Sequence, residues 1–203
     1  MKIVIVDYGM GNLKSISSVL TYLGVDTVIV SANYNDLENA DKLILPGVGS
    51  FGKAMSEIRY RKIDGYLQTL VFEKRKPLLG ICLGMQLLGL SSTEDGINQG
   101  LGFVQGYVTK FDSTKMKVPH VGFNQVKINE KLRLYRNIAD NADFYFTHSY
   151  RMMSDNNINQ CLCNYGGDFI AGFEVDNVAG VQFHPELSQY NGLKLLKNFI
   201  DLF

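Results

Sequence analysis

The sequence has no excess of either charge, because 20 lysine and arginine residues balance 20 aspartate and glutamate residues. Proteins that bind nucleic acid or anionic membrane surfaces usually carry clusters of basic side chains. The chain also has no charge-free apolar run close to the roughly 18 residues that cross a bilayer. We therefore expect a protein that binds neither nucleic acid nor a membrane.

Cysteine is scarce too, and the three cysteines are an odd number, which argues against a framework of disulfides. Cys161 and Cys163 are one residue apart, not two as in a zinc knuckle, so we interpret them as packing residues of a strand. No metal or other cofactor is expected. The N-terminal residues Met1 to Asp7 enter a strand at once and offer no cleavage site for a secretory signal. We expect a cytoplasmic protein.

What the sequence does have is apolar runs that alternate with helical patterns. Strand-like runs occupy residues 3–6, 25–30, 42–45 and 78–81, and helical patterns occupy residues 13–23, 50–74 and 83–90. This alternation predicts an α/β fold with a mainly parallel central sheet that is flanked by helices. With 46% hydrophobic residues, the 203-residue chain can form one sizeable core, so a single domain over residues 1–203 is expected.

The second half of the chain has shorter strand-like stretches that are separated by Gly, Asn and Asp. They cover residues 102–111, 118–128, 143–150, 159–165, 169–174 and 178–183, and a last helix is expected at 190–203. Phe169 to Phe183, with Asp176 and Asn177 at the tip, predicts an antiparallel hairpin. We therefore expect antiparallel strands to extend the parallel sheet.

A strand, a cysteine and a helix follow one another between Pro77 and Leu88. Gly80 and Gly84 flank Cys82 at two residues before and two after, which is the layout of the nucleophile elbow Gly-x-Ser-x-Gly. The glycines let a sharp strand-to-helix turn close, and the helix N-terminus favours a thiolate. This stretch alone leaves open that Cys82 is a small buried core residue.

The three histidines are the candidates for a catalytic base. His120 and His148 lie in or beside strands, where a buried structural histidine is the commoner outcome. His184 is followed by Pro185 and Glu186. In extended geometry residues two apart point the same way, so we expect Glu186 to reach the imidazole of His184. A carboxylate that orients a histidine beside a thiol is the cysteine version of a catalytic triad.

Two glycine-rich loops follow strands. Gly47-Val48-Gly49 lies beyond the carboxyl end of the third strand, where open α/β sheets bind ligands, and its N–H groups would suit an oxyanion hole. A flexible turn is the alternative for this loop. Gly9-Met10-Gly11 suggests a dinucleotide loop, but the third glycine and the acidic residue do not line up, so a dinucleotide site is disfavoured.

The elbow Gly80–Gln86 and the run His184-Pro185-Glu186 together resemble the class I, triad-type glutamine amidotransferases. Five further segments are similar to the glutaminase subunits of imidazole glycerol phosphate synthase, and they are residues 7–13, 46–51, 118–125, 145–150 and 182–186. The resemblance runs from the first strand to the last helix, and it implies a class I glutamine amidotransferase fold.

The resemblance also implies a mechanism. Cys82 attacks the side-chain amide of glutamine, His184 transfers protons and Glu186 orients His184. A γ-glutamyl thioester forms, ammonia leaves, and water then releases glutamate. The residues that would stabilise the oxyanion are Gly47, Val48, Gly49 and Leu83. The residues that would hold the amino-acid end of glutamine are Gln86, His148, Ser149 and Tyr150.

Members of this family pass ammonia to a (β/α)8-barrel cyclase subunit, which makes imidazole glycerol phosphate and aminoimidazole carboxamide ribotide in histidine biosynthesis. A heterodimer with such a cyclase is therefore expected. The family usually has lysine after His-Pro-Glu, at the point where ammonia crosses, whereas this chain has Leu187. Arg151 likewise stands where the family often has an aromatic residue.

Two other functions are considered. The first is a paralogous glutaminase that feeds a sugar amidotransferase for surface polysaccharide or glycan precursors, which the change at Leu187 leaves open. The second is a non-catalytic binding module with the same scaffold. The presence of Cys82, His184 and Glu186 argues against the second, because degenerate enzymes usually lose the nucleophile or the base.

Overall fold

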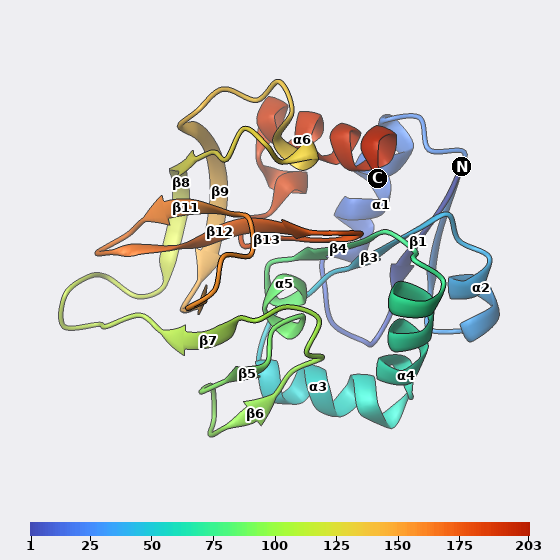
Figure 1. Ribbon diagram of the computed structural model, residues 1–203, viewed down its shortest axis with the longest axis horizontal. Coiled ribbons are helices and arrows are strands. Elements are labelled where there is room, and N and C mark those ends of the chain that lie inside the picture. The colour runs from blue at the N-terminus through green and yellow to red at the C-terminus, as the bar shows by residue number, and fades with distance from the viewer.

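The computed structural model describes all of residues 1–203. Its central sheet contains five parallel strands in the order β2-β1-β3-β4-β13 (Figure 1). Their bounds are β1 (Lys2–Val6), β2 (Thr27–Ser31), β3 (Lys42–Leu45), β4 (Leu78–Ile81) and β13 (Val178–Val181). The alternating pattern of the sequence predicts this parallel sheet correctly, although β2 begins two residues later than expected.

Helices cover both faces of this sheet (Figure 1). On one face lie α1 (Leu13–Tyr22) and α6 (Gln189–Leu202), and on the other lie α2 (Tyr34–Glu38), α3 (Phe51–Tyr60), α4 (Ile63–Gln68) and α5 (Leu83–Leu87). Ile3 and Ile5 of β1 belong to the first core cluster, and Val4 and Val6 belong to the second. A strand that is aliphatic throughout is stable only when both of its faces are covered.

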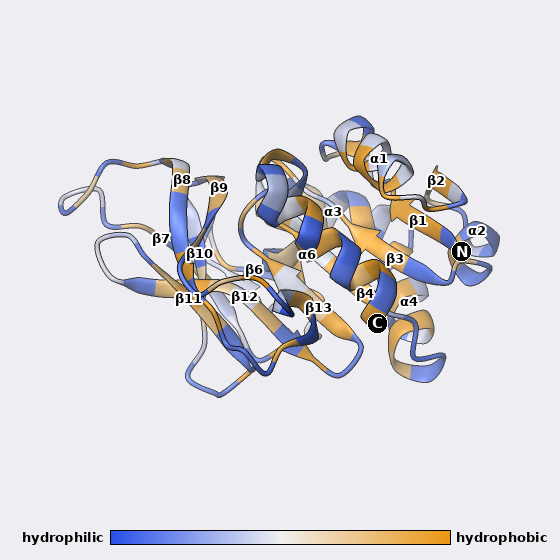
Figure 2. Cartoon of the chain, turned by 90° about the horizontal axis from the view of Figure 1, so that it is seen from above, coloured by the Kyte–Doolittle hydropathy of each residue, from blue (hydrophilic) through white to orange (hydrophobic).

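Hydropathy follows the same layers (Figure 2). The parallel strands are largely hydrophobic, whereas α6 alternates between hydrophobic and hydrophilic residues along its length. Leu195, Leu196 and Phe199 of α6 are fully buried against the sheet. Helix α1 ends at Tyr22, Leu23 is its C-cap, and Gly24 follows with a φ of 86°, in agreement with the helical pattern expected over residues 13–23. None of the helices is both long enough and apolar enough to span a bilayer.

The helical segment expected over residues 50–74 is present, but it is interrupted. The segment is divided into α3, α4 and a π-helical turn, Thr69–Glu73. Lys62 separates α3 from α4 with a left-handed φ of 59°, which a right-handed helix cannot accommodate. Buried residues continue across the break, as Ile58 and Ile63 show, so the apolar pattern of the sequence hides it. The short helix α2 was also not predicted.

The predicted hairpin is confirmed. Strand β12 (Asp168–Val175) pairs antiparallel with β13, and Asp176 and Asn177 connect them. From β12 the sheet continues in two directions (Figure 1). One branch contains β10 (Tyr150–Met153), β7 (Tyr107–Lys110), β5 (Ser91–Ser92) and β6 (Asn98–Gln99). The other contains β11 (Gln160–Asn164), β8 (His120–Lys127) and β9 (Ala142–His148).

Some expected strands have other bounds. The range 102–111 holds a strand only over Tyr107–Lys110, and the range 143–150 is divided between β9 and β10 at Ser149. The two-residue strands β5 and β6 were not predicted, because such short strands carry no readable hydrophobic pattern. Two 3₁₀ turns, Arg133–Tyr135 and Pro185–Leu187, complete the chain.

The hairpin explains how distant residues meet. Its second strand, β13, inserts beside β4, with Val181 opposite Ile81. Cys82 follows Ile81 directly, and its N–H donates to the Val181 carbonyl oxygen at 2.8 Å. His184 follows three residues after Val181. The carboxyl ends of two adjacent parallel strands therefore bring Cys82 and His184 to one edge of the sheet.

Candidate active site

Cys82 forms the turn between β4 and α5, with a φ of 54° and a ψ of −112°. This positive φ is rare and strained for a residue with a side chain. The two flanking glycines make room for the turn. A Cβ on Gly84 would lie 1.9 Å from the Leu45 carbonyl oxygen, and one on Gly80 would lie 2.8 Å from the Gly84 oxygen. The steric reason expected for both glycines is therefore present in the structure.

His184 lies beside this elbow and is only 3% exposed. Its Nδ1 is 2.9 Å from Oε1 of Glu186, whose side chain is fully buried. Asn12, in the loop before α1, donates from Nδ2 to the same Oε1 at 3.2 Å. The contact between His184 and Glu186 exists as expected, but the extended geometry expected for it is wrong. Pro185 to Leu187 form a 3₁₀ turn, which folds the carboxylate back to the ring.

The surroundings of His184 favour its protonated form. Burial acts to lower the pKa of His184, but the Cys82 sulfur and the Glu186 carboxylate outweigh it and raise the pKa to about 10. Nε2, the ring nitrogen turned away from Glu186, is buried beside that sulfur and has no other protein partner. An imidazolium in this position can stabilise a thiolate and later give a proton to a leaving group.

A cavity of about 460 Å³ opens above Cys82 and His184, a volume suited to a small metabolite. Three of the four expected oxyanion residues line it, namely Val48, Gly49 and Leu83. Gly47 does not line the cavity. It packs against the core, where a Cβ would lie 2.6 Å from Oη of Tyr8. All four residues expected to hold the amino-acid end of glutamine line the cavity, and they are Gln86, His148, Ser149 and Tyr150.

Sequence reasoning missed a carboxylate in this cavity. Glu94 lies between β5 and β6, and it is the only acidic residue that lines the cavity. Its Oε2 accepts from the N–H of Phe51 at 2.8 Å, at the start of α3, and burial raises the pKa of its carboxyl. Its segment has no regular pattern, so nothing in the sequence distinguished it from a surface acid. Asn12 was missed as a contact of Glu186, although it lies within a segment that carries the resemblance.

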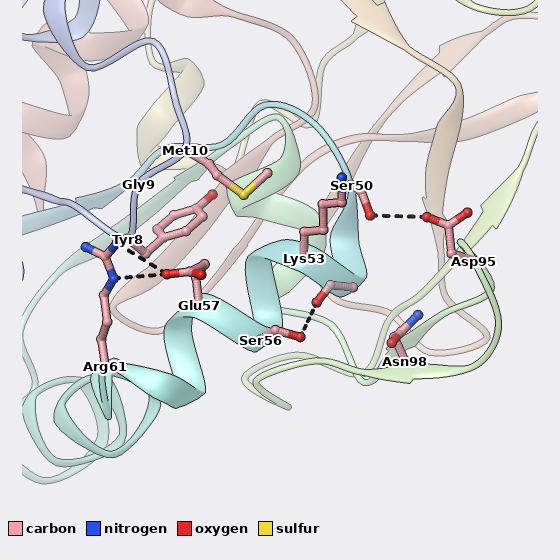
Figure 3. A pocket seen from close by; sticks show the side chains of 11 residues that line it. Tyr8, Gly9, Met10, Ser50, Lys53, Ser56, Glu57, Arg61, Asp95 and Asn98 are labelled. Atoms are coloured by element: carbon pink, nitrogen blue, oxygen red, sulfur yellow. Dashed lines mark hydrogen bonds and ion pairs between the residues drawn. The ribbon is translucent and has the colours of Figure 1, made fainter.

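A second hollow adjoins the same oxyanion segment (Figure 3). It is larger, at about 590 Å³, and more open, and its wall includes Met10, Ser50 and Lys53. Within it Arg61 forms an ion pair with Glu57, and the Ser50 hydroxyl donates a hydrogen bond to Asp95 (Figure 3). It contains no cysteine or histidine, so the smaller cavity is the candidate active site. No group of three or more His, Cys, Asp or Glu side chains could hold a metal ion.

The side chain of Arg151 packs against residues of its own chain. Its guanidinium lies over the ring of Phe111, 4.9 Å from the ring centre, close to the cavity wall at His148. Leu187, in contrast, is 44% exposed at the end of the 3₁₀ turn that contains Glu186. Of the two residues that depart from the expected family pattern, Leu187 presents its side chain to solvent and Arg151 packs largely within its own chain.

Comparisons with known proteins agree with this geometry. The model of the family described as Glutamine amidotransferase class-I matches residues 4–202. Two solved structures have the same fold, a glutamine amidotransferase with a TM-score of 0.77 and PurLQS from Thermotoga maritima with a TM-score of 0.74. They are 18% and 19% identical, and each alignment covers 98% of this chain and 97% of the other. The chain belongs to the class-I glutamine amidotransferases, which are enzymes.

Curated relatives narrow the family to one kind of subunit. Subunit HisH 1 of imidazole glycerol phosphate synthase from Campylobacter jejuni is 42% identical, over 98% of this chain and 100% of the relative. Subunit HisH from Aquifex aeolicus is also 42% identical, over 98% of this chain and 96% of the relative. Within the class-I family, the chain therefore belongs with the HisH subunits of imidazole glycerol phosphate synthase.

Proposed function

We propose that Cys82, His184 and Glu186 hydrolyse the side-chain amide of glutamine. The Cys82 sulfur attacks the amide carbon, and His184 gives its proton to the amide nitrogen as the C–N bond breaks. Ammonia leaves and a γ-glutamyl thioester remains. A water molecule then attacks the thioester while His184 accepts its proton, and glutamate is released. The observation that carries this proposal is a buried histidine that is hydrogen-bonded to a carboxylate and lies beside a strained cysteine.

The cavity lining supports glutamine as the substrate. Glutamine carries an ammonium group at the end remote from its reactive amide, and Glu94 provides the single carboxylate that lines the cavity. Ser149 and Tyr150 also line this cavity. At the reacting end, backbone N–H groups of Val48, Gly49 and Leu83 would stabilise the oxyanion. Gly47 would act indirectly, because its small size lets the loop approach the elbow.

The ammonia would pass to a (β/α)8-barrel cyclase subunit in histidine biosynthesis, as the similarity to HisH subunits over nearly the whole chain suggests. Exposed apolar residues on β8 and in the segment after His184 would form the contact with this cyclase. They are Val121 and Phe123 of β8 together with Leu187 and Tyr190, all between 44% and 71% exposed. The reaction would take place in the cytoplasm, where the three free cysteines stay reduced.

The test is glutamate release by the chain alone and with the cyclase subunit from the same cell. The isolated chain should hydrolyse glutamine weakly. The rate should rise sharply when the cyclase and its substrate are present, because each correctly placed oxyanion donor contributes about 10²–10³ in rate. Equal rates with and without the cyclase would contradict this coupling. If the cyclase does not bind at all, amidation of a sugar becomes the better proposal.

A further inference from the structure

A continuous chain of hydrogen bonds lies behind the cavity wall. His120 of β8 and His148 of β9 are directly opposite each other, and Nδ1 of His120 is 3.0 Å from Nε2 of His148. Nδ1 of His148 is 2.7 Å from the Tyr150 carbonyl oxygen. At the other end, Nε2 of His120 is 3.2 Å from Nδ2 of Asn124. All four ring nitrogens of the two histidines therefore have a partner within the protein.

When both imidazole rings are neutral, only one arrangement of protons satisfies every hydrogen bond in this series. A carbonyl oxygen can only accept, so Nδ1 of His148 must carry a hydrogen. Its Nε2 is then an acceptor, and Nδ1 of His120 must donate to it. Nε2 of His120 is in turn an acceptor, and the amide group of Asn124 donates to it. Every donor meets an acceptor, and the bonds point in one direction from Asn124 to Tyr150.

The surroundings keep both rings neutral. His120 stacks on Tyr165 with the ring centres 4.0 Å apart, and the rings of Phe111, Phe146 and Phe169 surround the pair. Burial lowers the pKa of His120 to about 4 and that of His148 to about 3. The groups whose positive charge would oppose protonation of His148 are His120, His184 and Arg151.

The hydrogen bonds continue from Tyr150 towards the nucleophile. The Tyr150 carbonyl also accepts from Nε2 of Gln86 at 2.9 Å, and the same Nε2 donates to Oε1 of Gln182 at 2.9 Å. Nε2 of Gln182 is 3.8 Å from the Cys82 sulfur. Both amide hydrogens of Gln86 are therefore used inside the protein. Its Oε1 is the polar atom left for a ligand in the cavity, and this atom can only accept.

We propose that His120 and His148 are positioning residues, which hold the Gln86 amide so that Oε1 faces the ammonium group of the substrate. The proposal rests on glutamine as the substrate of this cavity. The His148 N–H directs the Tyr150 carbonyl towards Gln86, and this carbonyl accepts only the nitrogen end of the amide. Without this constraint only the bond to Gln182 would hold the Gln86 amide, which could then turn more readily and present its NH₂ group to the ammonium, which has no acceptor to offer. Neither histidine takes part in the proton transfers at Cys82.

The first test reads the proton positions directly and needs no enzymatic activity. Long-range ¹H–¹⁵N correlation spectra of the labelled protein distinguish the two neutral histidine tautomers, and the chain has only three histidines. We expect His120 and His148 as the Nδ1–H tautomers, with no titration between about pH 5.5 and 8.5, on either side of the ordinary pKa of about 6.5. An Nε2–H tautomer at His148, or a titration near pH 6.5 in either ring, would overturn the proposal.

The second test uses two variants of His120. His120→Phe keeps a ring for stacking on Tyr165 but removes the donor to His148, and His120→Asn restores an N–H group near Nδ1. We expect the glutamine KM of His120→Phe to rise about tenfold, with kcat within about twofold, because one buried hydrogen bond that serves binding is lost. The KM of His120→Asn should stay within about threefold of the wild type. A lower kcat at unchanged KM in His120→Phe would refute a positioning role.

A labelling control separates this proposal from the proposed function. Iodoacetamide should alkylate Cys82 at the same rate in His120→Phe and the wild type, because the nucleophile is untouched. A glutamine-analogue electrophile should label the variant about tenfold more slowly. Equal labelling of both proteins by the analogue would refute the positioning role. A wild type that the analogue does not label would instead refute glutamine as the substrate, and the tautomer spectra would still decide how the histidines are arranged.

Discussion

Two histidines line the same cavity and are equally buried, yet their environments favour opposite protonation states. His184 is 3% exposed with a pKa raised to about 10, and His148 is 7% exposed with a pKa lowered to about 3. Burial alone would lower the pKa of both. The difference lies in their partners. His184 contacts a carboxylate and a sulfur, whereas His148 contacts a carbonyl oxygen and a second neutral imidazole.

Within one cavity, a charged histidine can therefore take part in the reaction while a neutral histidine holds other groups in position. A charged imidazole beside Cys82 can stabilise a thiolate and transfer protons. A neutral imidazole with both nitrogens engaged can do neither, but it can fix the direction of neighbouring hydrogen bonds. The sequence singles out His184 through Glu186, and the bonding partners in the structure add the opposite protonation states of His184 and His148.

Substituting Cys82, His184 or Glu186 should have the largest effect on activity. Cys82→Ser should abolish glutamate release, a loss of at least about 10⁴-fold, because the serine hydroxyl is a far weaker nucleophile at neutral pH. His184→Ala should be nearly as severe. Glu186→Ala should be about tenfold to a hundredfold milder than His184→Ala, since a histidine without its orienting carboxylate still samples the productive pose. Cys161→Ser, at a buried thiol outside the cavity, is the matched control, and turnover by Cys82→Ser would refute the mechanism.

Neutralising the carboxylate of the cavity should affect binding more than chemistry. Glu94→Gln keeps an acceptor for the Phe51 N–H but loses the charge that would face the substrate ammonium. We expect the glutamine KM to rise about tenfold to a hundredfold, the range for a lost charge-assisted hydrogen bond, with little change in kcat. Glu130→Gln, at an exposed acid, should have no effect. A fall in kcat at unchanged KM would show that Glu94 serves the reacting end instead.

Substitution of the exposed Leu187 tests which partner subunit this protein binds. If a cyclase has adapted to leucine at this position, Leu187→Lys introduces a charge without a partner at the contact and should weaken the complex by about 1–3 kcal/mol. A binding titration of both forms against the cyclase from the same cell measures this difference. Tighter binding by the lysine variant would mean that the cyclase is adapted to another glutaminase. Absence of binding by both forms would favour the sugar-amidation alternative.

The last prediction concerns the pH dependence of stability, where the two kinds of histidine contribute with opposite signs. His120 and His148 have lowered pKa values, so their contribution is present above about pH 6.5 and is lost as the pH falls through about 4 and about 3. His184 has a raised pKa, so its contribution is present below about pH 6.5 and is lost as the pH rises through about 10.

Urea unfolding between pH 4 and 10 measures these two contributions. One proton limits the slope of the unfolding free energy to about 1.4 kcal/mol per pH unit. His120→Phe should flatten the acid side of the stability curve, and His184→Ala should flatten the alkaline side. The reverse pattern, or parallel curves for all three proteins, would show that the contrast between the two kinds of histidine is wrong.

Most of the parallel strands could be read from the sequence because they are short aliphatic runs that are buried on both faces, whereas the half-exposed edge strand β2 could be read from its aliphatic residues alone. The elbow could be read because its glycines are required by close backbone contacts, such as that of Gly84 with Leu45. The break at Lys62 could not be read, because the buried residues on either side keep a helical pattern. The same holds for β5 and β6, which are too short to show any period.

The active site was harder to predict where residues act through tertiary contacts. Glu94 enters the cavity from an irregular segment, and only its bond to Phe51 and its burial reveal its position. The contact between His184 and Glu186 was expected from an extended strand, whereas a 3₁₀ turn makes it. The pairing of His120 with His148 depends on the register of β8 and β9, which no local pattern specifies.

The most direct test of the central claim is mass spectrometry of the protein after exposure to a glutamine-analogue electrophile. The chain contains its own controls, because burial raises the pKa of Cys161 and of Cys163 to about 12 and both thiols should stay unreactive. We predict a single adduct on Cys82, which excess glutamine prevents and which His184→Ala slows. An adduct on Cys161 or Cys163, or no adduct at Cys82, would contradict the assignment of Cys82 as the nucleophile.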